Sequence, residues 1–92
     1  MAVTIKLPTQ LRDAAGGATS TQVEGGTVGE ALEALYAEHD ELRARISDGG
    51  GGLRRFVNVY IGGEDIRFLD GLETPVEDGE ELTILPAVAG GA

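Results

Sequence analysis

The sequence predicts an α+β fold in which one main helix packs across one face of a mixed β-sheet. Three observations lead to this prediction: the order strand, strand, helix, strand, short strand, strand; a single segment with a clear helical repeat; and a length of 92 residues. A chain of this length forms one domain, because it buries only about 60–65% of its unfolded surface and supports one modest core. A helix between two hairpin-like halves buries its apolar side against the sheet that those halves form.

The first two strands are predicted over residues 3–7 and 18–24. Apolar and polar side chains alternate in residues 3–7, which is typical of a half-buried strand, and Pro8 ends the run. The intervening residues 9–17 are expected to be a connection that turns at Gly16-Gly17. Residues 18–24 alternate more weakly, and the two segments are predicted to pair as a hairpin.

The main helix is predicted over residues 28–38. Gly25-Gly26 interrupts the preceding strand, and Thr27 with Glu30 forms a capping box. In this motif the threonine hydroxyl accepts a hydrogen bond from a free backbone N–H, and the glutamate reaches back to the N–H of the cap residue. Apolar residues recur behind the cap at helical spacing: Val28, Leu32, Leu35, Leu42 and Ile46. The last two either extend this helix or form a short second turn.

The second half of the chain supplies the remaining strands. Residues 48–52 contain four consecutive glycines and are expected to form a mobile loop. Residues 56–61 give the strongest strand pattern, and residues 65–69 are interpreted as a short edge strand. Asp78-Gly79 is a turn before the last strand, residues 81–85. The helix is therefore followed by three strands.

Residues 1–86 are predicted to form the domain, and residues 87–92 a flexible tail of small, uncharged residues. Gly-Gly alone is a weak signal, because the pair occurs at four other places in the sequence. Gly90-Gly91 differs by its position after the last strand. A terminal carboxylate that must enter another enzyme's active site needs a thin leash without side chains, which glycine supplies. A frayed terminus without a role is the alternative.

The composition argues against several classes of protein. A net charge of −9 with seven scattered basic residues disfavours binding to nucleic acid and to anionic membranes. The charge favours basic protein partners, unless it serves solubility alone. The absence of cysteine excludes disulfides, thiolate metal sites and cysteine nucleophiles. Because the sequence shows no secretory leader pattern and no apolar run of about 20 residues, we expect a cytoplasmic protein.

No cluster of residues indicates catalysis. His39 is the only histidine, and between Glu38 and Asp40 it is most simply an exposed residue at a helix end. The acidic residues around it lack the spacing of a calcium-binding loop. Glu64-Asp65, at a turn, shows no general acid–base arrangement. The chain is therefore expected to be no enzyme and to bind no metal and no cofactor.

Two stretches resemble the ubiquitin-like sulfur carriers, a superfamily that includes the molybdopterin-synthase small subunit and the thiamine-pathway carriers. Residues 78–91, DGEELTILPAVAGG, are similar to the ending of these proteins. Residues 55–68, which include RFVNVYI and EDIRF, are most similar to the actinobacterial branch of the cysteine pathway. The resemblance implies the β-grasp (ubiquitin-like) fold, with the first and last strands adjacent at the centre of the sheet.

The resemblance also implies how the tail works. In this family an E1-like enzyme uses ATP to adenylate the terminal glycine carboxylate, which is then converted to a thiocarboxylate. Carried over to this sequence, the reactive position is Gly91, with Gly90 and Ala89 as its leash. In the cysteine branch the thiocarboxylate attacks an aminoacrylate on the pyridoxal phosphate of a cysteine synthase, and a metalloprotease frees the cysteine. The cofactor ATP is thus used by the partner and not held by the carrier.

One residue departs from the family pattern, since Ala92 follows Gly91. Either a protease, such as the metalloprotease of the cysteine branch, removes Ala92, or the residue is tolerated or engineered. Three other functions stay open: a molybdopterin-synthase small subunit, a ubiquitin-like modifier conjugated to lysines, and an inert β-grasp interaction module.

A partner-docking face is predicted from the period of the strands. The branched residues at positions 57, 59 and 61 should face the helix, because burying them stabilises the fold by several kcal/mol at about 25 cal/mol per Å². Phe56 and Tyr60 then lie on the opposite, open face, and so does Leu85 of the last strand. Apolar residues gathered there, near the start of the tail, are typical of a protein interface. A loop that merely covers them is the alternative.

Overall fold

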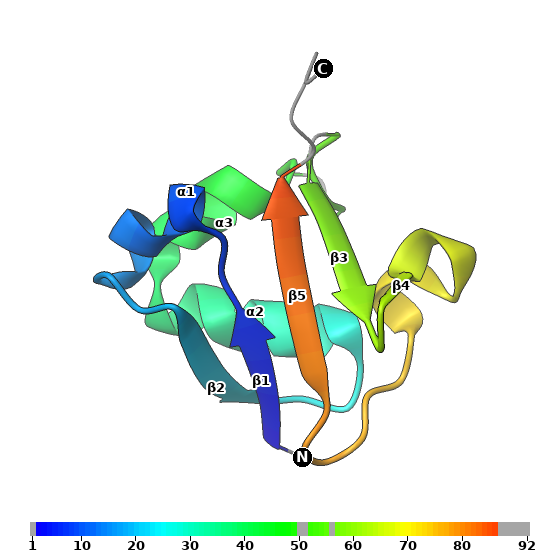
Figure 1. Ribbon diagram of the computed structural model, residues 1–92. Helices are drawn as coiled ribbons and strands as arrows, with labels where there is room; N and C mark the ends of the chain where they lie inside the picture. The colour runs from blue at the N-terminus through cyan, green and yellow to red at the C-terminus, as the bar shows by residue number, and fades with distance from the viewer. Residues whose placement is uncertain (1, 50–51, 56, 87–92) are drawn as a thin grey trace.

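The computed structural model describes residues 2–49, 52–55 and 57–86 (Figure 1). Five strands form one sheet in the order β2-β1-β5-β3-β4. The strands are β1 (Ala2–Lys6), β2 (Ser20–Glu24), β3 (Val57–Ile61), β4 (Glu64–Asp65) and β5 (Glu81–Pro86). The α-helices are α1 (Thr9–Arg12), α2 (Val28–Glu38) and α3 (Asp40–Ile46), and 3₁₀ turns occupy Asp13–Ala15, Ile66–Phe68 and Gly71–Glu73.

The first and last strands lie side by side at the centre of the sheet. β1 pairs antiparallel with β2, as the predicted hairpin requires, and parallel with β5. β5 pairs antiparallel with β3 on its other side. A parallel pair needs a long crossover connection, and α2 runs within it across one face of the sheet (Figure 1). The predicted mixed sheet with one main helix across it is confirmed.

The core lies between the sheet and α2. Val59 of β3 and Ile84 of β5 are fully buried on the sheet side, and Leu35 of α2 is fully buried opposite them. Leu42 and Ile46 belong to α3, a separate short helix that starts after one non-helical residue, and both are fully buried. Each such side chain contributes about 1.5–3 kcal/mol by burial. None of the helices in the described parts of the chain is long and apolar enough to span a bilayer.

Helix α2 begins where the sequence predicts, but one of its two capping bonds differs. The Thr27 hydroxyl accepts a hydrogen bond from the backbone N–H of Glu30 at 3.1 Å. The Glu30 carboxylate, in contrast, accepts from the N–H of Gly26 at 2.8 Å rather than from that of the cap residue. The glutamate therefore ties the helix to the residue before the cap, at the end of the loop that follows β2.

Three predicted segments differ from the structure or lie partly outside its described residues. The connection 9–17 is largely helical, because Leu11 anchors it to the core. The edge strand predicted over residues 65–69 is present only as β4, which ends at Asp65. There the chain turns, the buried Ile66 enters the core, and the Asp65 carboxylate accepts from the N–H of Arg67 at 2.8 Å. The loop 48–52 is predicted to be mobile, and two of its glycines lie outside the described residues.

The close approach of Gly25 to helix α2 gives a stability prediction. A Cβ on Gly25 would lie 2.7 Å from the backbone nitrogen of Ala31. We expect Gly25→Ala to lower the free energy of unfolding by about 1–3 kcal/mol, since helix backbone must move to admit the methyl group. Urea denaturation measures this loss.

The neighbouring Gly26→Ala is the matched control. Among the described residues, its Cβ would approach only a carboxylate oxygen of Glu30, at 3.3 Å, and that side chain can shift. We expect its free energy of unfolding to change by less than about 1 kcal/mol. Equal losses in the two variants would contradict the close approach at Gly25.

Candidate functional site

The central strand β5 brings the chain to the tail at one end of the sheet. β5 ends at Pro86, which pairs with Val57, the first residue of β3. The predicted reactive position Gly91, its leash Gly90 and Ala89, and Ala92 all lie outside the described residues. The structure therefore defines the place where the tail begins, in the middle of the sheet's end and not at a sheet edge.

The two faces of the sheet carry the side chains that the period of two assigns to them. Val57 and Val59 are buried toward the helix, whereas Tyr60 is half-buried on the open face. Leu85 lies on the open face as well and is 44% exposed. Phe56 lies outside the described residues. The role of this face in docking stays a prediction.

Neighbouring strands bring polar residues around these apolar ones. Leu85 pairs with Asn58 of β3, and Tyr60 pairs with Thr83 of β5. Thr83 also pairs with Lys6 of β1, so the open face mixes one aromatic, one aliphatic and several polar side chains. A mixed surface of this kind is typical of interfaces that form and dissociate.

Arg67 donates hydrogen bonds to the outer edge of β3. β4 pairs only with the end of β3, so on this outer side the first residues of β3 face no strand of the described sheet, although β5 pairs with them on the other side. The Arg67 guanidinium donates one hydrogen bond to the Val57 carbonyl at 3.0 Å and another to the Asn58 side chain at 2.8 Å. Sequence reasoning missed this residue. Its only signal is its place in the stretch that resembles the cysteine-pathway carriers.

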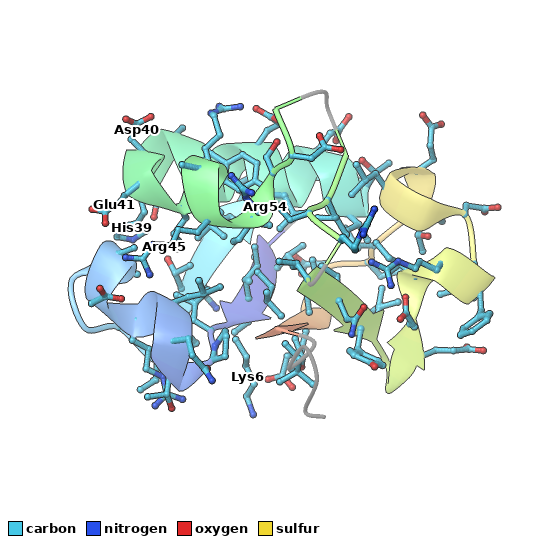
Figure 2. The ribbon with its side chains drawn as sticks, turned by 90° about the horizontal axis from the view of Figure 1, so that it is seen from above. Lys6, His39, Asp40, Glu41, Arg45 and Arg54 are labelled. Atoms are coloured by element: carbon cyan, nitrogen blue, oxygen red, sulfur yellow. The ribbon has the colours of Figure 1, made fainter. Side chains whose placement is uncertain are left out.

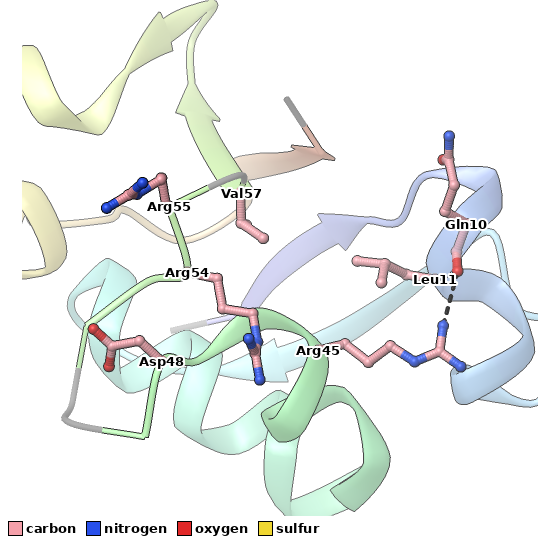
Figure 3. A pocket seen from close by; sticks show the side chains of 7 residues that line it. All are labelled: Gln10, Leu11, Arg45, Asp48, Arg54, Arg55 and Val57. Atoms are coloured by element: carbon pink, nitrogen blue, oxygen red, sulfur yellow. Dashed lines mark hydrogen bonds between the residues drawn. The ribbon is translucent and has the colours of Figure 1, made fainter. Parts of the chain in front are cut away.

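Two hollows flank the end of β5. The larger, of about 490 Å³, is shown in Figure 3 and is lined by Gln10, Leu11, Arg45, Asp48, Arg54, Arg55 and Val57. Leu11 and Val57 are its apolar members, and the Arg45 guanidinium donates to the Gln10 carbonyl at 3.1 Å. The second hollow, of about 370 Å³, lies between the ends of β1 and β5 and includes Lys6, Arg12 and Leu85.

The described residues show no cluster of metal-binding side chains. No group of three His, Asp or Glu side chains among them could hold a metal ion. His39 lies beside Asp40 and Glu41 at the edge of the molecule, away from the end of β5 (Figure 2). Burial in the helix layer raises the pKa of the Tyr36 hydroxyl to about 12, with a smaller contribution from Glu33. That shift follows from packing and identifies no acid–base group.

The sequence matches known proteins over almost its whole length. The model of the ThiS family matches residues 5–91. The sulfur carrier protein CysO of Mycobacterium tuberculosis is 45% identical over 93 residues, which cover 99% of this chain and 100% of the relative.

Solved structures also match over nearly the whole chain. A chain of the crystal structure of the Amycolatopsis orientalis BexX/CysO complex matches with a TM-score of 0.89 and 47% identity, over 97% of this chain and 99% of that chain. The solution structure of the small archaeal modifier protein 1 of Methanosarcina acetivorans matches with a TM-score of 0.87 and 35% identity, over 98% and 96% of the two chains. The predicted β-grasp fold is confirmed.

The assignment of the two sheet faces predicts opposite outcomes for two substitutions. Leu85→Glu should leave the melting temperature nearly unchanged, because the new carboxylate points into water. Val59→Asp should lower the free energy of unfolding by about 4 kcal/mol or more, because it buries a charge without a partner. Thermal melts followed by circular dichroism compare the two variants. Unfolding of the Leu85 variant beside a stable Val59 variant would mean that the faces are reversed.

Proposed function

The chain belongs to the ThiS family, and from that premise we propose that it is a sulfur carrier protein whose C-terminal carboxylate does the chemical work. The observation that carries the proposal is the match to CysO, 45% identical over essentially the whole length of both chains. The geometry supports it, because the central strand delivers the tail at an open end of the sheet. On this proposal the chain is a protein co-substrate and not a catalyst.

The proposed chemistry begins with activation of the Gly91 carboxylate. A carboxylate resists attack by nucleophiles, so an E1-like enzyme transfers AMP to it from ATP and releases pyrophosphate. A sulfide donor then displaces AMP and leaves a thiocarboxylate on Gly91. Because the sequence contains no cysteine, the sulfur cannot travel as a persulfide on a side chain. ATP belongs to the activating partner, and the carrier itself needs no bound cofactor.

We assign the sulfur to cysteine biosynthesis, since the relatives named CysO match at 45% identity. The sulfur-accepting partner would then be a cysteine synthase that holds an aminoacrylate on pyridoxal phosphate. A synthase of another pathway, such as molybdopterin synthase, is the alternative acceptor. Both reactions belong to the cytoplasm, where ATP and the activating enzyme are available.

A protein modifier is the second candidate function. It is favoured by the 35% identity to the small archaeal modifier protein 1 of Methanosarcina acetivorans. A modifier would be joined to lysines of other proteins and would appear in cells as adducts of higher mass, whereas a carrier would appear free. An inert interaction module would show neither adducts nor activation.

We further propose that the open face around Tyr60 and Leu85, together with Phe56, docks the activating enzyme or the synthase. The exposure of Leu85 supports this role, because a partner that covers a half-exposed leucine on a sheet face buries its apolar surface. Charged substitutions of Phe56, Tyr60 or Leu85 should weaken partner binding in a calorimetric titration without unfolding the domain.

The proposed role of the tail predicts that it is needed for chemistry but not for folding. Deleting Gly90 and Gly91 should abolish adenylation, measured as ATP–pyrophosphate exchange with the E1-like enzyme. The melting temperature should change by less than about 2 °C, because terminal residues contribute little to the free energy of folding. A large loss of stability would show that the tail is structural, and full exchange activity would contradict the carrier function.

The fate of Ala92 gives a separate prediction. If the carboxylate of Gly91 reacts, the protein isolated from its native host should contain chains that end at Gly91. We propose that the metalloprotease of the cysteine branch removes Ala92. Intact-protein mass spectrometry detects the loss of one alanine. Chains that all end at Ala92 and still form thiocarboxylate would contradict trimming.

A further inference from the structure

The basic side chains gather around the end of β5, although the sequence as a whole is acidic. Arg54 and Arg55 line the larger hollow beside Val57, which pairs with the last residue of β5. Lys6 and Arg12 line the smaller hollow on the other side of that strand. Figure 2, which looks onto this end of the molecule, shows Lys6 and Arg54 on opposite sides of β5.

Two further arginines complete the set. Arg45 lines the larger hollow, and Arg67 reaches Asn58, which pairs with the exposed Leu85. Six of the seven basic residues of the sequence therefore surround the place where the tail begins. We call these six the basic collar: Lys6, Arg12, Arg45, Arg54, Arg55 and Arg67.

The opposite end of the same strands is acidic. Asp78 accepts a hydrogen bond from the N–H of Ala2, at the start of β1, at 2.8 Å. Glu24 of β2 pairs with Ala2 across the hairpin, and Glu80 immediately precedes β5. The net charge of −9 thus conceals a dipole along the sheet, with its positive end where the tail begins.

Part of the collar's charge has no carboxylate partner among the residues that the structure describes. Arg45 forms ion pairs with Asp13 at 3.3 Å and Glu41 at 3.4 Å. The Arg54 guanidinium, in contrast, donates only to the carbonyl of Ala44 among the described residues, at 2.7 Å. The exposed guanidinium of Arg55 has no hydrogen bond or ion pair with the described part of the chain. The guanidinium groups of Arg54 and Arg55 are therefore not neutralised by a carboxylate among the described residues.

We infer that the basic collar docks against an acidic surface of the enzyme that activates the tail, an inference that rests on the proposed function. An enzyme that takes the terminus into its active site must approach the end of β5 and cover the collar. Covering unpaired guanidinium groups costs free energy unless carboxylates of the partner meet them. The hollow in Figure 3 suits such a contact, because its lining combines the apolar side chains of Leu11 and Val57 with three arginines and a single carboxylate, that of Asp48.

The dipole also orients the encounter. An acidic partner surface attracts the collar and repels the acidic end, so the carrier arrives with its tail forward. Steering of this kind raises association rate constants by about 10–1,000-fold and weakens as salt is added. The end that carries the tail therefore requires an acidic partner surface, whereas the net charge alone favours a basic partner.

The proposed docking role of the collar is tested by measuring, without ATP, the rate constant at which the carrier associates with the E1-like enzyme. Arg55→Glu should lower this constant by about five- to tenfold at about 0.01 M ionic strength, where the Debye length is about 30 Å. At about 1 M, where the Debye length is about 3 Å, the difference should nearly vanish. Arg55→Lys keeps the charge and should stay within about twofold of the unsubstituted protein.

Arg43→Glu is the matched control, because it changes the net charge by the same amount outside the collar. Arg43 lies over the Tyr36 ring at 5.0 Å and pairs with Glu33 at 3.1 Å. Its variant should associate within about twofold of the unsubstituted protein. Melting temperatures of all variants exclude unfolding as the cause.

The outcomes separate the collar from the carrier function. Equal slowing by Arg43→Glu and Arg55→Glu, no slowing by either, or no association of the unsubstituted protein would overturn the collar. Slowing by Arg55→Glu alone, without any ATP–pyrophosphate exchange, would support the collar and overturn the carrier function. Normal ATP–pyrophosphate exchange, together with an association rate constant that Arg55→Glu leaves unchanged, would support the carrier function and overturn the collar.

Discussion

The parallel pairing of β1 with β5 is the constraint on which the rest of the structure depends. A parallel pair cannot be closed by a tight turn, so the middle of the chain must cross over, and α2 covers the sheet as part of that crossover. The pairing also places the last strand between two neighbours. The tail therefore starts from a strand that is held by hydrogen bonds on both sides, and a partner that pulls on the tail acts on a central strand and not on an edge strand.

Local patterns in the sequence predicted the parts of the fold that local physics determines. The alternation of apolar and polar residues correctly predicted that Val59 is buried against the helix and that Leu85 is exposed on the open face. Successive side chains of a strand point to opposite faces, so the register of the pattern assigns each residue to one face. Thr27 marked the start of α2, because a hydroxyl at that position satisfies a free N–H group. Short helices such as α1 escaped prediction, because a single turn is stable only through tertiary burial, here of Leu11.

The site was less predictable because it is assembled from distant segments. The collar combines residues of β1, α1, α3, the stretch before β3 and the turn after β4, and only the topology brings them to one end. Net charge is a sum over the sequence and contains no information about position. The net charge therefore suggested basic partners, whereas six of the seven basic residues gather around the start of the tail. The contact of Arg67 with Asn58 was not predicted for a similar reason, because no repeating pattern in the sequence indicates a hydrogen bond between these two side chains.

The central claim is that the carboxylate of Gly91 carries sulfur. The most direct test incubates a chain that ends at Gly91 with the E1-like enzyme, ATP and a sulfide donor, followed by intact-protein mass spectrometry. We expect a mass increase equal to the replacement of one oxygen by sulfur, located at Gly91 and dependent on ATP. An unchanged mass, in the presence of an enzyme shown to activate its own carrier, would contradict it.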